Sequence, residues 1–182
     1  MNRDAGLANL FRKLKTILNL EGEYFSHSTA LYLLGQLPSL PEHLTAVSHR
    51  RRRNRESLER PFTFIFHPKG KCRPTQTVPW QGMILPVSTL EKTLIDLVGD
   101  FDYSPPLLGL ADLFATLPFQ CGTLVNLARQ SSDSALKRVS FLLAWTGRIE
   151  EKDIPFEVFT RTPVKLDPRA GTENSNWDNR FF

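Results

Sequence analysis

Several features are scarce in this 182-residue chain. It contains only two cysteines, Cys72 and Cys121, and no apolar run approaches the length of a membrane span. Two cysteines cannot staple a chain of this size, so a disulfide scaffold is excluded and a reducing compartment is expected. The amino-terminal residues lack the apolar stretch of a secretory signal. With 41% hydrophobic residues the chain is not wholly disordered. We expect a cytoplasmic globular protein with no membrane partner.

The motifs of cofactor-dependent and covalent catalysis are missing as well. Neither G-x-x-x-x-G-K-[ST] nor G-x-G-x-x-G nor G-x-S-x-G occurs. Among the potential metal ligands, only His67 and Cys72 are close in sequence, and the chain has no second closely spaced pair of ligands, which a structural zinc site usually requires. The remaining potential ligands are His27, His43, His49 and Cys121. We therefore expect no cofactor, no metal and no catalytic residue, which favours a protein that is not an enzyme.

Positive charge is concentrated in one segment. The formal net charge is only +4, but residues 49–55 read His-Arg-Arg-Arg-Arg-Asn-Arg. Such a run can hold several phosphates, and arginine is well suited to bidentate phosphate contacts. A solvated mobile loop is the equal alternative, and docking of an acidic protein is a lesser one. The candidate nucleic-acid-binding residues are Arg50, Arg51, Arg52, Arg53 and Arg55.

The amino-terminal half of the chain predicts two helices followed by a small sheet. Apolar residues recur at helical spacing over 7–18, and a short helix with Ser26 as its cap is expected over 27–36. Strands are expected at 43–48, 62–66 and 83–87, with Pro86 placing the last at an edge or a strand end. The arginine run then resembles a β-hairpin arm between two strands, and the Pro-, Lys- and Gly-rich segment 68–80 is expected to be a loop.

The carboxyl-terminal half predicts mostly helices. Ser88 and Glu91 fit a capping box, and Pro105-Pro106 suits the start of a further helix whose apolar residues 107–117 are expected to be buried. Helices are also expected at 123–129 and 133–145, with Gly147 ending the last, and a strand at 162–166. The predicted fold class is α/β (α+β-like): a small mixed or antiparallel sheet packed with several helices.

Four segments, in order, resemble the AbiEi-type antitoxins of bacterial type IV toxin–antitoxin systems. Tyr24-Phe-Ser-His-Ser-Thr-Ala-Leu31 is similar to the opening segment of the antitoxin domain, and Leu90-Glu-Lys-Thr-Leu-Ile-Asp96 is similar to one of its helices. Arg138-Val-Ser-Phe-Leu-Leu143 with Gly147, and Thr162 to Pro168 with Trp177, resemble its later segments. The motif positions are Ser26, His27, Glu91, Lys92, Asp96 and Arg138. The resemblance covers residues 24–180.

The resemblance implies a non-enzymatic regulator whose functional partner is a cognate nucleotidyltransferase-like toxin, and a role in phage defence by abortive infection. It also implies an amino-terminal winged helix that binds operon DNA, but only one amphipathic helix precedes the matching region. The expected organisation is a helix over 1–22, the antitoxin-like domain over 23–170 and a tail over 171–182. A DNA-binding transcriptional regulator or accessory protein is the alternative. A metal-dependent nuclease using Glu91 or Asp96 is a weaker one, because five residues of helix turn those side chains apart.

Overall fold

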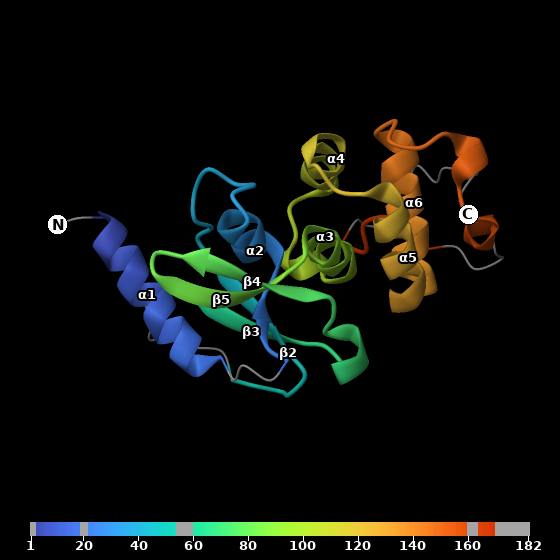
Figure 1. Cartoon of the computed structure of the whole chain (residues 1–182). Coiled ribbons are helices and arrows are strands. Elements are labelled where there is room, and N and C mark those ends of the chain that lie inside the picture. The colour runs from blue at the N-terminus through green and yellow to red at the C-terminus, as the bar shows by residue number, and fades with distance from the viewer. Residues whose placement is uncertain (1–2, 19–21, 54–59, 160–163, 170–182) are drawn as a thin grey trace. The chain divides into compact units, whose positions relative to one another are not determined.

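The computed structural model describes residues 3–18, 22–53, 60–159 and 164–169. The chain forms two compact units, Met1–Thr93 and Leu94–Phe182, and we describe each by itself. The first holds a mixed five-stranded sheet with helices, and the second is helical, which confirms the predicted α/β class (Figure 1). None of the described helices is long and apolar enough to cross a membrane.

Among its described residues, the first unit contains two complete helices and five strands. The helices are α1 (Arg3–Ile17) and α2 (His27–Leu33), and a 3-10 turn, η1, covers Lys69–Lys71. The strands are β1 (Tyr24–Phe25), β2 (Leu44–Ser48), β3 (Phe62–Phe66), β4 (Thr75–Trp80) and β5 (Met83–Ser88). Their order in the sheet is β3-β2-β1-β5-β4. The strands predicted at 43–48, 62–66 and 83–87 are confirmed to within a residue.

Alternation along the strands places the larger of the two buried clusters of this unit on one face of the sheet, and Tyr24, Val47 and Ile65 belong to a second, smaller one. Phe62 and Phe64 of β3 belong to the same buried cluster as Leu85 and Val87 of β5. The apolar stripe of α1 covers this cluster with three buried side chains, Leu10, Phe11 and Leu14, and Leu18, directly after the helix, joins them. Phe11 meets the Phe25 ring edge-on, with 5.5 Å between ring centroids. The first helix is therefore part of the core of the sheet unit.

Two expectations about this sheet are wrong. The predicted loop 68–80 contains β4, which pairs with β5 from Thr75↔Ser88 to Trp80↔Met83. β4 is an edge strand with mostly exposed residues, so it lacks the apolar alternation of a core strand and tolerates Pro79. Pro86 lies in an interior strand, because β5 stands between β4 and β1. β1 pairs with β5 only at Phe25↔Val87. The other residues of β5, Pro86 included, have no partner in β1.

The arginine run is not a hairpin arm. β2 and β3 pair in parallel, from Leu44↔Phe62 to Ser48↔Phe66. A tight hairpin joins only antiparallel strands, and parallel neighbours need a crossover of about a dozen residues or more. Residues 49–61 are this crossover, of which 54–59 lie outside the described part of the chain.

The second unit is built from helices. α3 (Leu90–Gly99) begins in the first unit and continues into the second, followed by α4 (Leu107–Thr116), α5 (Cys121–Ser131) and α6 (Asp133–Trp145). Short 3-10 turns are η2 (Phe101–Tyr103), η3 (Glu151–Asp153) and η4 (Phe156–Phe159). Gly147, with φ of +69°, ends α6 as predicted, and its N–H donates to Ala144 O at 3.0 Å.

Three details of this half differ from the sequence-based expectations. Ser88 is the last residue of β5 and does not cap α3. The hydroxyl that accepts a hydrogen bond from a helix N–H is that of Thr89, which accepts from the Lys92 N–H at 3.3 Å. The predicted Ser88–Glu91 capping box therefore does not form. Helix α4 is not buried all round, since Leu108 is 69% exposed. Of the strand predicted at 162–166, residues 162–163 lie outside the described chain and 164–166 are not in a strand.

The cap of α6 offers a test of this helical unit. Ser132 Oγ accepts a hydrogen bond from Ala135 N at 3.1 Å. We expect Ser132→Ala to lower the free energy of unfolding by about 1 kcal/mol, because it leaves an orphan N–H at the helix start. Chemical denaturation followed by circular dichroism measures it. Ser131→Ala, one residue earlier at the end of α5, is the matched control, and an equal loss in both variants would refute the cap.

Candidate nucleic-acid interface

A buried carboxylate organises the start of the arginine run. Glu23 is 2% exposed and immediately precedes β1. The Ser48 hydroxyl, at the end of β2, donates to Glu23 Oε1 at 2.7 Å, and Arg52 Nη1 donates to Oε2 at 2.5 Å. The register Tyr24↔Val47 brings Glu23 opposite Ser48, so the sheet itself positions the acceptor. A buried carboxylate requires such partners, since an unpaired one is costly to bury.

Arg52 is thereby an internal anchor. Its guanidinium also lies over the Phe64 ring, with Cζ 4.3 Å from the ring centroid. The Arg50 N–H donates to Ser48 Oγ at 3.0 Å, which fixes the backbone between the strand and the anchor. Of the four predicted nucleic-acid-binding residues that the structure describes, Arg52 is the one engaged with the protein's own carboxylate.

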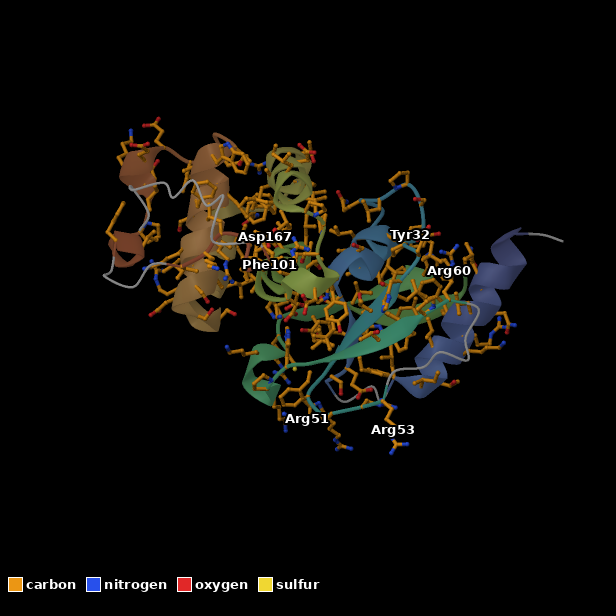
Figure 2. The ribbon with its side chains drawn as sticks, turned by 180° about the vertical axis from the view of Figure 1, so that it is seen from behind. Tyr32, Arg51, Arg53, Arg60, Phe101 and Asp167 are labelled. Atoms are coloured by element: carbon orange, nitrogen blue, oxygen red, sulfur yellow. The ribbon has the colours of Figure 1, made fainter. Side chains whose placement is uncertain are left out.

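The other arginines of the run divide into two groups. Arg50, Arg51 and Arg53 are exposed, and Figure 2 shows the side chains of Arg51 and Arg53 pointing away from the sheet. Arg51 Cζ stands 5.7 Å from the centroid of the Phe66 ring. Arg55 lies outside the described residues. The described exposed arginines are thus available to a phosphate backbone, whereas Arg52 is not.

The first motif pair, Ser26 and His27, lies buried between β1 and α2. Ser26 is the N-terminal cap residue of α2 as predicted, but its hydroxyl makes no capping bond. Its carbonyl instead accepts from Thr45 Oγ1 at 2.9 Å. His27 is fully buried with φ of +55°, a left-handed backbone that is strained in a residue with a side chain. These residues shape the turn from strand to helix.

The second motif group lies on α3. Lys92 and Asp96 are buried, and Glu91 is half-buried. Within the first unit, Lys92 Nζ stands 5.7 Å from the centroid of the Tyr24 ring. Neither Lys92 nor Asp96 offers an exposed charge to a partner, so these positions contribute to the interior.

Arg138, the last motif position, links two segments of the second unit through hydrogen bonds to their backbone carbonyls. Its Nε donates to Lys165 O at 2.9 Å and its Nη1 to Val98 O at 3.3 Å. Its guanidinium lies over Phe101, 4.9 Å from the ring centroid, and Arg169 approaches the same ring at 5.3 Å. Burial lowers the pKa of Arg138, and the charge of Asp167 opposes that shift. Arginine remains charged even so, because its ordinary pKa is far above neutrality.

Two further arginines, neither of them among the predicted site residues, also donate to backbone carbonyls. Arg148 donates to the carbonyls of Phe114, Ala115, Leu117 and Phe119 at 3.1 to 3.4 Å, at and beyond the end of α4. Arg169 donates to the carbonyls of Phe101, Ser104 and Pro105. Several of these carbonyls lie at the end of α4 or just after η2, where a helix end leaves carbonyls without an intrahelical partner, and Phe101 O also accepts from the Ser104 N–H at 3.1 Å. No spacing rule in the sequence signals this role.

Comparison with solved structures yields a structural likeness. No protein-family model matches the chain, and no curated protein does. A solved structure, the RV2827C protein from Mycobacterium tuberculosis, is similar with a TM-score of 0.53 and 16% sequence identity. The likeness covers 75% of this chain and 52% of the mycobacterial one, so the match spans about half the length of that protein. At this identity the likeness shows a shared fold.

The anchoring role of Arg52 is testable against its neighbour. We expect Arg52→Ala to lower the free energy of unfolding by about 2 to 3 kcal/mol, because it leaves the Glu23 carboxylate buried without its cation. Arg53→Ala removes the same side chain from an exposed position and is expected to cost less than about 0.5 kcal/mol. Urea denaturation of both variants measures the difference. Equal effects would contradict the anchor, and Glu23→Gln added to Arg52→Ala is expected to recover part of the loss.

The pair of Asp167 and Arg169 predicts an acid dependence. The hydrogen bonds from Arg169 lower the pKa of Asp167, against a weaker opposing effect of burial. A carboxyl whose pKa is lower in the folded chain stabilises the fold above its unfolded value of about 3.9, and this stabilisation disappears as pH falls through the folded pKa. We expect Arg169→Gln to raise the Asp167 pKa toward its ordinary value in an NMR titration. Arg129→Gln, an exposed arginine on α5, is expected to leave it unchanged.

Proposed function

We propose that this protein is an antitoxin-like regulator that counteracts a nucleotidyltransferase-like toxin without catalysing a reaction. The observation that carries the proposal is the ordered series of segments that resemble AbiEi-type antitoxins. The motif positions Ser26, His27, Lys92 and Asp96 are buried, and Arg138 bonds two carbonyls. Buried positions of this kind maintain a fold, so a resemblance at them supports a common architecture.

Two exposed features support a binding role. Arg50, Arg51 and Arg53 offer cations to a polyanion. The helical unit exposes large apolar side chains on separate elements: Leu108 on α4, Trp145 on α6 and Phe159 on η4, at 69%, 48% and 52%. Exposed aromatic residues are enriched among the residues that carry interface energy. We propose that the helical unit provides the toxin-neutralising surface, through direct contact or through the toxin's target.

Co-expression tests this function. We expect the product of the adjacent open reading frame to arrest growth when expressed alone, and co-expression of this chain to restore growth. Colony counts under separate induction of the two genes measure both effects. Trp145→Ser and Leu108→Ser are expected to weaken the rescue, whereas Ser131→Ala is not. A toxic neighbour whose arrest this chain does not relieve would refute the proposal, and pull-down separates direct contact from indirect action.

A DNA-binding regulator or accessory protein is the second candidate, and the exposure of Arg50, Arg51 and Arg53 favours it. Gel shifts on the operon's own upstream DNA discriminate the two functions. Binding that persists in excess competitor DNA, together with failure to relieve the arrest, would favour the regulator.

A further inference from the structure

Two separate segments of the chain, residues 49–53 and 67–73, leave the same end of the sheet. β2 and β3 run parallel, and Ser48 stands opposite Phe66 where both strands end. The His67 N–H donates to Ser48 O at 2.9 Å, which ties the start of one segment to the end of the other strand. Residues 49–53 and 67–73 therefore begin side by side, and the contact of Arg51 with the Phe66 ring joins them.

These segments carry charge of one sign. Residues 44–53 and 62–75 contain seven lysines and arginines and no aspartate or glutamate. One of the seven, Arg52, is paired with the buried Glu23. The other six are exposed: Arg50, Arg51, Arg53, Lys69, Lys71 and Arg73. The last three belong to the segment 68–80, which the sequence predicts as a loop. The arginine run therefore supplies only half of the cations of this surface.

An exposed aromatic ring lies among these cations. Phe62 and Phe64 of β3 are 1% and 7% exposed, but Phe66, on the same side of the strand, is 47% exposed. Burial in the core therefore does not account for a phenylalanine at this position. An aromatic ring beside a guanidinium is a platform on which a base stacks, with the cation on its phosphate or on its π-face.

We propose that Arg50, Arg51, Arg53, Phe66, Lys69, Lys71 and Arg73 form a binding surface for single-stranded nucleic acid, which we term the basic strand-end surface. Base-edge readout of duplex DNA usually requires a helix or a β-ribbon in the major groove. The described part of this surface contains the last residue of β3 and the three-residue turn η1, and neither is long enough for that role. Cations with an exposed ring are the features that non-sequence-specific single-strand binding uses.

This surface deepens the proposed nucleic-acid contact without depending on toxin neutralisation, because binding is measured on the purified full chain with no partner present. Fluorescence anisotropy with labelled oligo(dT) and oligo(U) of about 20 nucleotides, and with a duplex of the same length, is the assay. We expect both single strands to bind at least fivefold more tightly than the duplex at low salt. The tighter of the two identifies DNA or RNA as the preferred strand. Absence of binding at about 50 mM salt, or tighter binding of the duplex, would overturn the proposal.

Charge variants locate the surface. We expect Lys69→Gln with Lys71→Gln to reduce the slope of log affinity against log salt by about 1.4, since each phosphate contact to a single strand contributes about 0.7. Arg12→Gln with Lys13→Gln removes the same charge from exposed positions on α1 and is expected to leave the slope nearly unchanged. Equal reductions in both double variants would mean that only net charge matters, and would overturn the site.

The role of the Phe66 ring can be tested separately from that of the charges. We expect Phe66→Ala to weaken single-strand binding about fivefold or more with an unchanged salt slope, because stacking releases no counterions. Ile84→Ala, at a 60% exposed position on β5, is the matched control and is expected to have no effect. Phe66→Tyr keeps the ring and is expected to retain binding. If folded Phe66→Ala, verified by circular dichroism, binds as the parent chain does, the stacking platform is refuted.

Discussion

The need to pair one buried carboxylate determines how the arginine run leaves the sheet. Glu23 sits at 2% exposure beside the end of β2, where Ser48 and Arg52 supply its hydrogen bonds. Satisfying that charge turns the Arg52 side chain inward over the Phe64 ring. The neighbouring arginines then face solvent, because the anchor fixes the backbone between them. One internal ion pair thus separates a cation that holds the fold from cations that remain free for a ligand.

The same division of labour recurs in the helical unit. Arg138, Arg148 and Arg169 each donate to at least one backbone carbonyl at a helix end or a turn, and Arg138 and Arg169 both lie near the Phe101 ring. A guanidinium suits this task because its several donors can serve several acceptors in one plane. These arginines therefore replace capping residues that the local sequence does not supply. The number of basic residues in the sequence overstates the charge that is available to a partner, because several of them bond the protein's own carbonyls and carboxylates.

Periodicity predicted the elements that bury an apolar face and failed where burial does not shape the sequence. The stripe of α1, the phenylalanines of β3 and the helix α6 follow directly from spacing. β4 is not predicted because its residues are mostly exposed. Pro86 is predicted at an edge or a strand end because proline cannot donate to a sheet ladder, whereas the two-residue β1 beside β5 pairs with it only at Phe25↔Val87. The pairing of Glu23 with Arg52 joins residues far apart in sequence, and the antiparallel register of β1 and β2 brings them together.

Only part of the basic strand-end surface could be predicted from the sequence. Composition alone located the arginine run, since clustered charge is visible in any sequence. It did not connect Lys69, Lys71 and Arg73 to that run, because their proximity follows from β2 and β3 being parallel neighbours. Had the two strands formed a hairpin, the segments after them would have left opposite ends of the sheet. The parallel pairing is therefore what converts two modest basic segments into one continuous surface, with Phe66 between them.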